Sequence, residues 1–370
     1  MRGYCCALVA DTASVFASIG LSSTQDFLGC GESPSGREVL FLIDGLGADA
    51  IKTYRDQIPV LAAAIDKGVI TTSFPTTTAT SLATLTTGAM PGAHGMLGYT
   101  VRVPRSGGRV LNTLKWDERV DPQIWQPIPT LFEQAMAAGI TTTHVAAKRY
   151  EGSGFTRAVF RGANYKGANI VADLIEETIR ALSASPSFVY LYVNDLDSAG
   201  HSDGVGSDKW LAALRGVDQL LAELIQKVPA GTRVWITADH GMINVQEKVV
   251  LGRDNSLLTD ITTIAGEPRM RHLYLSTESE SAALEVIARW QSELGQRVSL
   301  FTRQSAIAAG LFGSEVSLEA AERMGDVIAI AQGNLVLLDP ERADKEGEMV
   351  GHHGGDSEIE SSVPLLLLQR

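Results

Sequence analysis

Short, almost uninterrupted apolar runs constrain the fold of this chain more than any other feature. Such runs have the length of a strand and are too short for an average helix. A strand that is apolar on both faces is typical of a parallel sheet covered by helices on both sides. Helical patterns separate the runs, which is the order expected of an α/β protein. The clearest runs cover residues 39–43, 188–193, 233–237 and 363–368.

The sequence therefore predicts an α/β fold with a mostly parallel central sheet and helices on both faces. Residues 1–37 are expected to form a lead-in packed on the core. The core itself is expected to comprise 38–264 and 346–370. Residues 265–345 differ in texture and predict a small α+β cap insert. Within the core we expect one helix over residues 48–67, and a loop or flap over 100–128, where periodicity is weak.

The stretch from 69 to 99 predicts a buried strand, a sharp turn and a helix. The apolar pair Val69-Ile70 leads to Pro75, three consecutive threonines follow, and Gly88 closes the helical pattern. The N-terminus of a helix has unpaired N–H groups and the positive end of the dipole, so it binds anions such as phosphate. A hydroxyl-capped helix without chemistry would have the same pattern. The residues alone do not separate Thr76, Thr77 and Thr78.

Polar side chains with metal-ligand chemistry follow the predicted strands. In open α/β sheets, ligands bind beyond the carboxyl ends of the strands. Carboxylates together with imidazoles favour zinc or another first-row metal over magnesium or calcium. Charged groups at buried strand ends are costly unless they are paired or bind a metal. The candidates are Asp44, Asp195, Asp197, His201, Asp239, His240, His352 and His353.

The formal net charge of −12 over 370 residues argues against binding to nucleic acids or anionic membranes. An enzyme that acts on anions would then need local positive charge, which bound divalent cations supply. The three cysteines, Cys5, Cys6 and Cys30, do not form a disulfide framework. No apolar stretch approaches the roughly 20 residues of a membrane span, and the first residues lack the features of a signal peptide. We therefore expect a cytoplasmic protein.

Several motifs resemble those of the alkaline phosphatase superfamily, and most of all its type I phosphodiesterase / nucleotide pyrophosphatase branch. The resemblance extends from about Val39 to Leu368. It rests on an apolar strand ending in Asp-Gly, Pro-Thr-Thr-Thr followed by Thr-Gly and Pro-x-x-His-Gly, Asp-x-x-x-His, Thr-Ala-Asp-His-Gly-Met, and a late Gly-x-His-Gly.

The resemblance implies two divalent metal ions, most simply zinc. One would be held by Asp44, Thr78, Asp239 and His240, and the other by Asp197, His201 and His353. The family pattern selects Asp197 over Asp195 and His353 over His352. It also places the nucleophile ten residues before the glycine of Thr87-Gly88, which is Thr78. A phospho-threonine intermediate and a small phosphodiester or nucleotide substrate would follow.

The sequence departs from relatives beside the expected phosphate. Where they carry an asparagine after His-Gly, this chain has Tyr99, which would donate a hydrogen bond instead. Asn112 is a second candidate donor, and Ser81 lies in a segment where relatives have Pro-Asn-His. These changes leave a phosphomonoesterase or phosphonate hydrolase of the superfamily as an alternative. A catalytically inactive binding or scaffold protein on the same fold is a second alternative. A homodimer is compatible with each of these functions.

Overall fold

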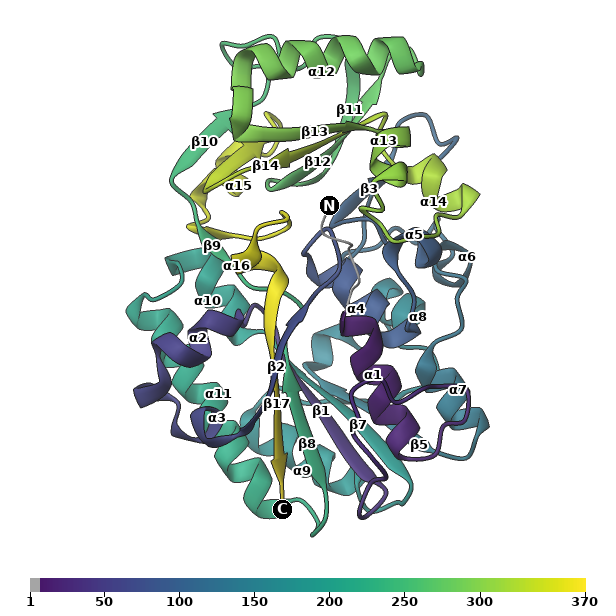
Figure 1. Cartoon of the computed structure of the whole chain (residues 1–370), viewed down its shortest axis with the longest axis vertical. Coiled ribbons are helices and arrows are strands. Elements are labelled where there is room, and N and C mark those ends of the chain that lie inside the picture. Colours follow the sequence, from purple (N-terminus) through teal and green to yellow (C-terminus); the bar gives the residue numbers. More distant parts are fainter. Residues whose placement is uncertain (1–6) are drawn as a thin grey trace.

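The computed structural model describes residues 7–370, so Cys5 and Cys6 lie outside the described residues. Its core is a seven-stranded sheet (Figure 1). Only β17 runs antiparallel to its neighbours, and the remaining strands are parallel to one another, as the sequence predicted. In spatial order the strands are β2 (Ile65–Thr71), β17 (Ser362–Gln369), β8 (Arg233–Thr237), β1 (Arg37–Ile43), β7 (Ser187–Val193), β5 (Thr141–Ala146) and β6 (Asn164–Gly167).

Helices cover both faces of this sheet because its central strands are buried throughout (Figure 1). One face carries α2 (Ala48–Thr53), α3 (Pro59–Ala63), α9 (Val171–Ala181), α10 (Asp195–Asp203) and α11 (Asp208–Lys227). The other face carries α1 (Ala7–Ser18), α4 (Thr78–Thr87), α5 (Pro91–His94), α6 (Pro122–Trp125), α7 (Leu131–Ala137) and α8 (Gly154–Val159). None of the helices within residues 7–370 has both the length and the apolar character needed to cross a bilayer.

Three local predictions were wrong. The strand at 65–71 is β2, an exposed sheet edge where Ile65 and Val69 are each 55% exposed. The single helix expected over 48–67 is divided into α2, a 3-10 turn at Arg55–Gln57 and α3, and its last residues belong to β2. Pro59, which has no N–H to continue a helix, starts α3. The flap contains a short hairpin, β3 (Thr100–Arg102) with β4 (Val110–Asn112), and the helix α6.

A second sheet lies beyond the carboxyl ends of the core strands (Figure 1). It is antiparallel, and α12 (Glu280–Leu294) packs on it through an apolar cluster of its own. Its strands are β11 (Ile261–Glu267), β12 (Met270–Leu275), β14 (Val327–Ala331) and β13 (Val298–Thr302). Strand β11 begins at Ile261, before residue 265, where the cap insert was expected to start. The division of the chain into core and cap stays a prediction.

Short elements complete the chain on either side of this second sheet. Two minor pairs are β10 (Glu247–Val250) with β15 (Leu335–Leu338), and β9 (Ile243–Asn244) with β16 (Gly351–His352). The second pair places the returning chain directly beside the end of β8. The remaining helices are α13 (Arg303–Ala308), α14 (Leu318–Arg323), α15 (Ala343–Glu348) and α16 (Glu358–Ser361).

Candidate metal centre and active site

The candidate ligands converge at the carboxyl ends of the core strands. Asp44 follows β1, and Asp239 and His240 follow β8. Helix α10 follows β7 and presents Asp197 and His201, which lie four residues apart and therefore on one face of the helix. Together with His353 of the returning chain, four parts of the chain that are distant in sequence supply one cluster.

A first group consists of Asp44, Asp239 and His240, all of them buried. Nε2 of His240 lies 3.4 Å from Oδ1 of Asp44 and 3.4 Å from Oδ2 of Asp239. Thr78 is the first residue of α4, and its Oγ1 lies 3.2 Å from the same Nε2 atom. The hydroxyl of Thr78 therefore lies against this group at the N-terminus of a helix.

A second group consists of Asp197, His201 and His353. Oδ1 of Asp197 lies 3.4 Å from Nε2 of His201 and 3.7 Å from Nε2 of His353. The two Nε2 atoms are 3.2 Å apart. The rings of His353 and His240 stack with centroids 3.5 Å apart, so the two groups adjoin.

The three histidines are oriented in the same way. Each has its Nδ1 within hydrogen-bond distance of a backbone carbonyl: His201 donates to Gly351, His240 to Gly241 and His353 to Thr76. A neutral imidazole that donates from Nδ1 has its lone pair on Nε2. Three Nε2 lone pairs therefore face the carboxylates, and metal-binding histidines are held by this kind of backbone contact.

The carboxylates have unused acceptors in the same place. Asp44 Oδ1, Asp197 Oδ1 and Asp239 Oδ2 are buried and have no hydrogen-bond partner among the described residues. Burial raises the pKa of Asp44 well above its usual value, and the neighbouring carboxylates of Asp239 and Asp197 raise it further. Burial also raises the pKa of Asp239. Negative oxygens and imidazole lone pairs that face one another without donors fit divalent cations, and the residues present therefore fit the metal ions that the sequence predicted.

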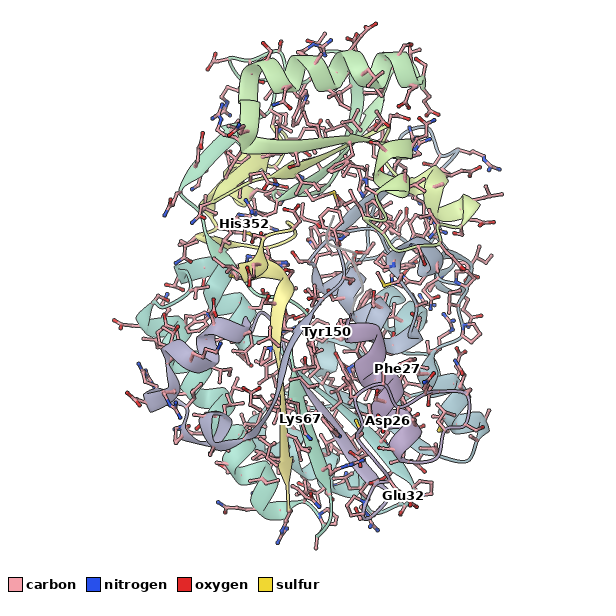
Figure 2. The ribbon with its side chains drawn as sticks, in the orientation of Figure 1. Asp26, Phe27, Glu32, Lys67, Tyr150 and His352 are labelled. Carbon is pink, nitrogen blue, oxygen red and sulfur yellow. The ribbon has the colours of Figure 1, made fainter. Side chains whose placement is uncertain are left out.

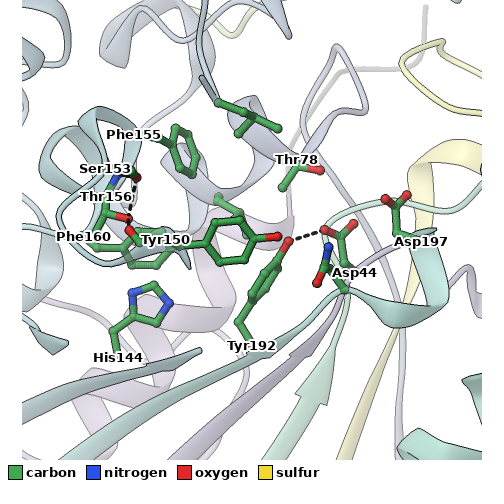
Figure 3. A pocket seen from close by; sticks show the side chains of 13 residues that line it. Asp44, Thr78, His144, Tyr150, Ser153, Phe155, Thr156, Phe160, Tyr192 and Asp197 are labelled. Atoms are coloured by element: carbon green, nitrogen blue, oxygen red, sulfur yellow. Dashed lines mark hydrogen bonds between the residues drawn. The ribbon is translucent and has the colours of Figure 1, made fainter. Parts of the chain in front are cut away.

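Tyr192 contributes to this site, although the sequence reasoning did not single it out. It lies near the end of β7, and its hydroxyl donates to Oδ2 of Asp44 (Figure 3). That bond occupies one carboxylate oxygen and leaves Oδ1 facing His240. The only available signal was its position next to last in a strand whose end carries ligands.

The three threonines have different environments. Thr76 donates from Oγ1 to the carbonyl of Gly355 and so holds the segment that carries His353. Thr77 is the N-cap of α4. The first two N–H groups of the helix, those of Thr78 and Ala79, donate to no acceptor in the described part of the chain. These N–H groups are free for an anion beside the Thr78 hydroxyl.

Two cavities adjoin Thr78. The first has an aromatic wall, drawn in Figure 3, that includes Tyr150, Phe155, Phe160 and Tyr192. The second lies toward the second sheet and is lined by Tyr99, Glu267, His352 and other residues. Thr78, Asp197 and Leu114 line both cavities. Sequence reasoning did not single out Tyr150, Phe155, Phe160 or Glu267, because no local pattern marks them.

The other predicted residues lie in several environments. Asp195 is exposed, and His352 contacts the carbonyl of Glu346 through Nε2 at 3.1 Å. Oδ1 of Asn112 accepts the N–H groups of Leu114 and Lys115, so this side chain shapes a turn and is not in the wall of either cavity.

Ser81 does not face a substrate, although its sequence position suggested that it stands beside the phosphate. It is fully buried in a hydroxyl network, with its Oγ 2.9 Å from Oγ1 of Thr72. Tyr99 lines the second cavity, and its role as a substrate contact stays a prediction.

The sheet and its ligand-bearing strand ends define an alkaline-phosphatase-like α/β protein with a candidate metal centre. More specifically, the chain belongs to the type I phosphodiesterase / nucleotide pyrophosphatase family, whose model matches residues 39–356.

Curated relatives share this part of the chain. Mouse ectonucleotide pyrophosphatase/phosphodiesterase family member 3 is 26% identical over 225 residues, covering 55% of this chain and 24% of the relative. An uncharacterized pyrophosphatase/phosphodiesterase of Schizosaccharomyces pombe is 23% identical over 233 residues, covering 59% and 47%. The chain thus spans between a quarter and a half of the length of these relatives.

Solved structures share the fold. Murine ectonucleotide pyrophosphatase/phosphodiesterase 5 matches with a TM-score of 0.69 at 16% identity, covering 89% of this chain and 87% of that one. The human protein of the same name matches with a TM-score of 0.69 at 18% identity, over 90% and 87% of the two chains. The murine protein was also solved as an inactive threonine-to-alanine variant in complex with AMP.

Proposed function

We propose that the protein is a metal-dependent phosphohydrolase, and specifically a phosphodiesterase or nucleotide pyrophosphatase that uses Thr78 as its nucleophile. The observation that carries this proposal is the position of the Thr78 hydroxyl. It lies at a helix N-terminus, 3.2 Å from Nε2 of His240 and against a cluster of ligand atoms without donors.

The proposed centre holds two zinc ions. Asp44, Thr78, Asp239 and His240 would hold one, and Asp197, His201 and His353 the other. When bound, such ions lower the pKa of a coordinated hydroxyl and stabilise negative charge on the leaving oxygen. Tyr192 keeps Oδ1 of Asp44 directed at the centre by occupying Oδ2.

In the proposed reaction, Oγ1 of Thr78 gives up its proton to solvent and forms a bond to phosphorus, while the bond from phosphorus to the leaving oxygen breaks and that oxygen departs with the leaving group. This gives a phospho-threonine, which water then hydrolyses to restore the hydroxyl. The N–H groups of Thr78 and Ala79 hold the phosphoryl oxygens as negative charge builds on them.

The two cavities beside Thr78 favour a diester over a monoester. A diester carries two organic groups on phosphorus, and each cavity offers room for one of them. The aromatic wall suits a nucleoside, because a base stacks on aromatic rings. The AMP complex of the murine structure supports this choice of substrate.

Three substrates assayed side by side with added zinc test the proposal: bis-p-nitrophenyl phosphate, p-nitrophenyl phosphate and a nucleoside 5′-p-nitrophenyl phosphate. We expect the two diesters to have the higher kcat/KM. A preference for the monoester would contradict the assignment and favour a phosphomonoesterase. A protein that binds zinc but hydrolyses none of the three would favour a binding or scaffold role. Cytoplasmic location and a homodimer stay predictions.

A further inference from the structure

Glu267 is a buried carboxyl group near the proposed reaction centre that the mechanism does not use. It ends β11, and the turn after it leads into the antiparallel partner strand β12. The side chain is only 5% exposed and lines the second cavity together with Thr78, Tyr99 and His353. His352, in the same wall, lies between the second sheet and α16 (Figure 2).

One oxygen of this carboxyl group has a partner and the other has none. Oε2 accepts the backbone N–H of Tyr99 at 2.9 Å. Oε1 is buried without a hydrogen-bond partner among the described residues. No basic side chain of residues 7–370 forms an ion pair with Glu267, and the nearby Arg271 pairs with Glu346 instead. Burial raises the pKa of Glu267 to about 8, against the opposing effects of the Tyr99 N–H and Arg271.

Two glycines make room for this side chain. A Cβ atom on Gly354 would lie 2.4 Å from Cγ of Glu267, and one on Gly98 would lie 3.1 Å from Oε2. The φ angles of Gly354 and Gly98 are positive, 118° and 151°, and residues with a Cβ atom rarely adopt such angles. The backbone on both sides is therefore shaped to admit a carboxyl group at this point.

Two other polar side chains of this wall have partners within the protein. Glu346 accepts from Arg271, and His352 contacts the carbonyl of Glu346. Outside the metal cluster, Oε1 of Glu267 is the buried side-chain atom of this wall that has no hydrogen-bond partner among the described residues. A buried polar atom without a partner is costly, and a ligand that supplies a hydrogen bond recovers that cost.

We propose that Glu267 selects diesters in which the organic group that enters the second cavity carries a hydroxyl, as the glyceryl group of a polyol ester does. The hydroxyl would hydrogen-bond to Oε1 while the nucleoside occupies the aromatic cavity. A hydroxyl can donate to a carboxylate or accept from a carboxylic acid, so it satisfies Oε1 in either protonation state. An alkyl group of the same length leaves Oε1 without a partner. This inference rests on the proposed diesterase function and names one arm of its substrate.

Two diesters that differ only in hydroxyl groups test the proposal: adenosine 5′-phosphoglycerol and its propyl counterpart, with AMP release followed by chromatography. We expect the wild-type protein to prefer the glyceryl ester by about 10-fold or more in kcat/KM. Glu267→Leu should lose the preference mainly by slowing the glyceryl ester. Glu267→Gln should retain most of it, because an amide still offers a hydrogen bond. Glu278→Leu, an exposed change in the segment after β12, should keep the wild-type ratio.

Equal rates for the two esters with the wild-type protein would overturn the inference while leaving the diesterase assignment intact. An unchanged preference in Glu267→Leu would also overturn it. If Glu267→Leu does not fold, the wild-type ratio and its retention in Glu267→Gln still decide the question. A wild-type protein that hydrolyses neither ester would overturn the proposed function and this inference with it.

Discussion

The two ends of strands β1 and β8 carry buried carboxylates in opposite situations. At the amino end, Glu38 is fully buried and accepts from Nε of Arg233 at 2.8 Å and from Nε1 of Trp235 at 2.7 Å. Burial raises the pKa of Glu38, and these partners oppose that shift. Each oxygen of this carboxylate has a donor within the protein.

At the carboxyl end of the same strands, Asp44 and Asp239 lie close to each other, and each has an oxygen without a donor. The two ends differ in partners and not in burial. An isolated buried charge is far more costly than one paired with a hydrogen-bonded cation. The amino end is therefore complete within the protein, whereas the carboxyl end is complete only with bound cations.

The largest effect that this comparison predicts is on catalysis at the carboxyl end. Thr78→Ala removes the proposed nucleophile and should lower kcat/KM for a diester by at least about 10³-fold, or about 4 kcal/mol in the transition state. The unfolding free energy should change by less than about 1 kcal/mol, because within residues 7–370 the hydroxyl of Thr78 has a single hydrogen-bond partner, His240. Enzyme assay and denaturant unfolding measure the two quantities.

Thr86→Ala is the matched control, since it makes the same change in the same helix, where the hydroxyl donates to the carbonyl of Ala83. Its activity should stay near that of the wild type. Wild-type activity in Thr78→Ala would exclude Thr78 as the nucleophile.

At the amino end the effect should be on stability. Glu38→Gln leaves the guanidinium of Arg233 buried without its counter-charge and should lower the unfolding free energy by about 3–5 kcal/mol. Turnover per folded molecule should not change. Glu223→Gln breaks an exposed pair with Lys227 and should cost less than about 1 kcal/mol. An equally small loss for Glu38→Gln would show that this end is not held by its ion pair.

Replacing a buried carboxylate usually lowers the unfolding free energy, but in the metal-free protein it should raise it. In chelator-treated protein, Asp239→Asn should raise the unfolding free energy by about 1–2 kcal/mol, because it removes one of several crowded charges. An amide can keep the Oδ1 bonds from Gly45 and His240 and donate to Nε2 of His240. With zinc present the same variant should lose stability relative to the wild type, as melting curves would show. Destabilisation in both conditions would mean that the empty cluster is not strained by its charges.

The sequence predicts the central strands and the ligands after them, because both depend on local pattern. A run such as 188–193 must be buried on both faces, and the residues after it must lie at the sheet end. The edge strand β2 was wrongly expected to be buried, since its apolar residues do not reveal that it has a single neighbour. The roles of Tyr192 and Glu267 could not be predicted in this way, because they depend on contacts with Asp44 and Tyr99 that form only in the folded protein. That information comes from the tertiary structure and not from spacing.

The smallest expected effect concerns His144, a buried histidine on β5 that lacks hydrogen-bond partners within residues 7–370. Neither nitrogen of His144 has a hydrogen-bond partner among the described residues, and Phe160, Tyr165 and Tyr190 surround its ring. Burial lowers the pKa of His144 to about 3, below its usual value of 6.5. Between these values the unfolded chain binds a proton that the folded protein excludes, so stability falls as the pH falls.

His144→Phe removes this titration and suits the aromatic surroundings. Its loss of unfolding free energy from pH 7 to pH 6 should be about 0.5–1 kcal/mol smaller than that of the wild type. Denaturant unfolding of both proteins in chelator measures the difference, because the histidines of the metal cluster contribute equally to each. His94 is also buried with a pKa lowered to about 3, and it remains in both proteins. Identical pH dependence would mean that the His144 ring is protonated in the folded protein as readily as in the unfolded chain. Burial without a hydrogen-bond partner would then not be enough to disfavour a charged group. The cost of the unpartnered carboxylate oxygens in the metal cluster would come instead from the mutual repulsion of the carboxylates, which a bound cation relieves.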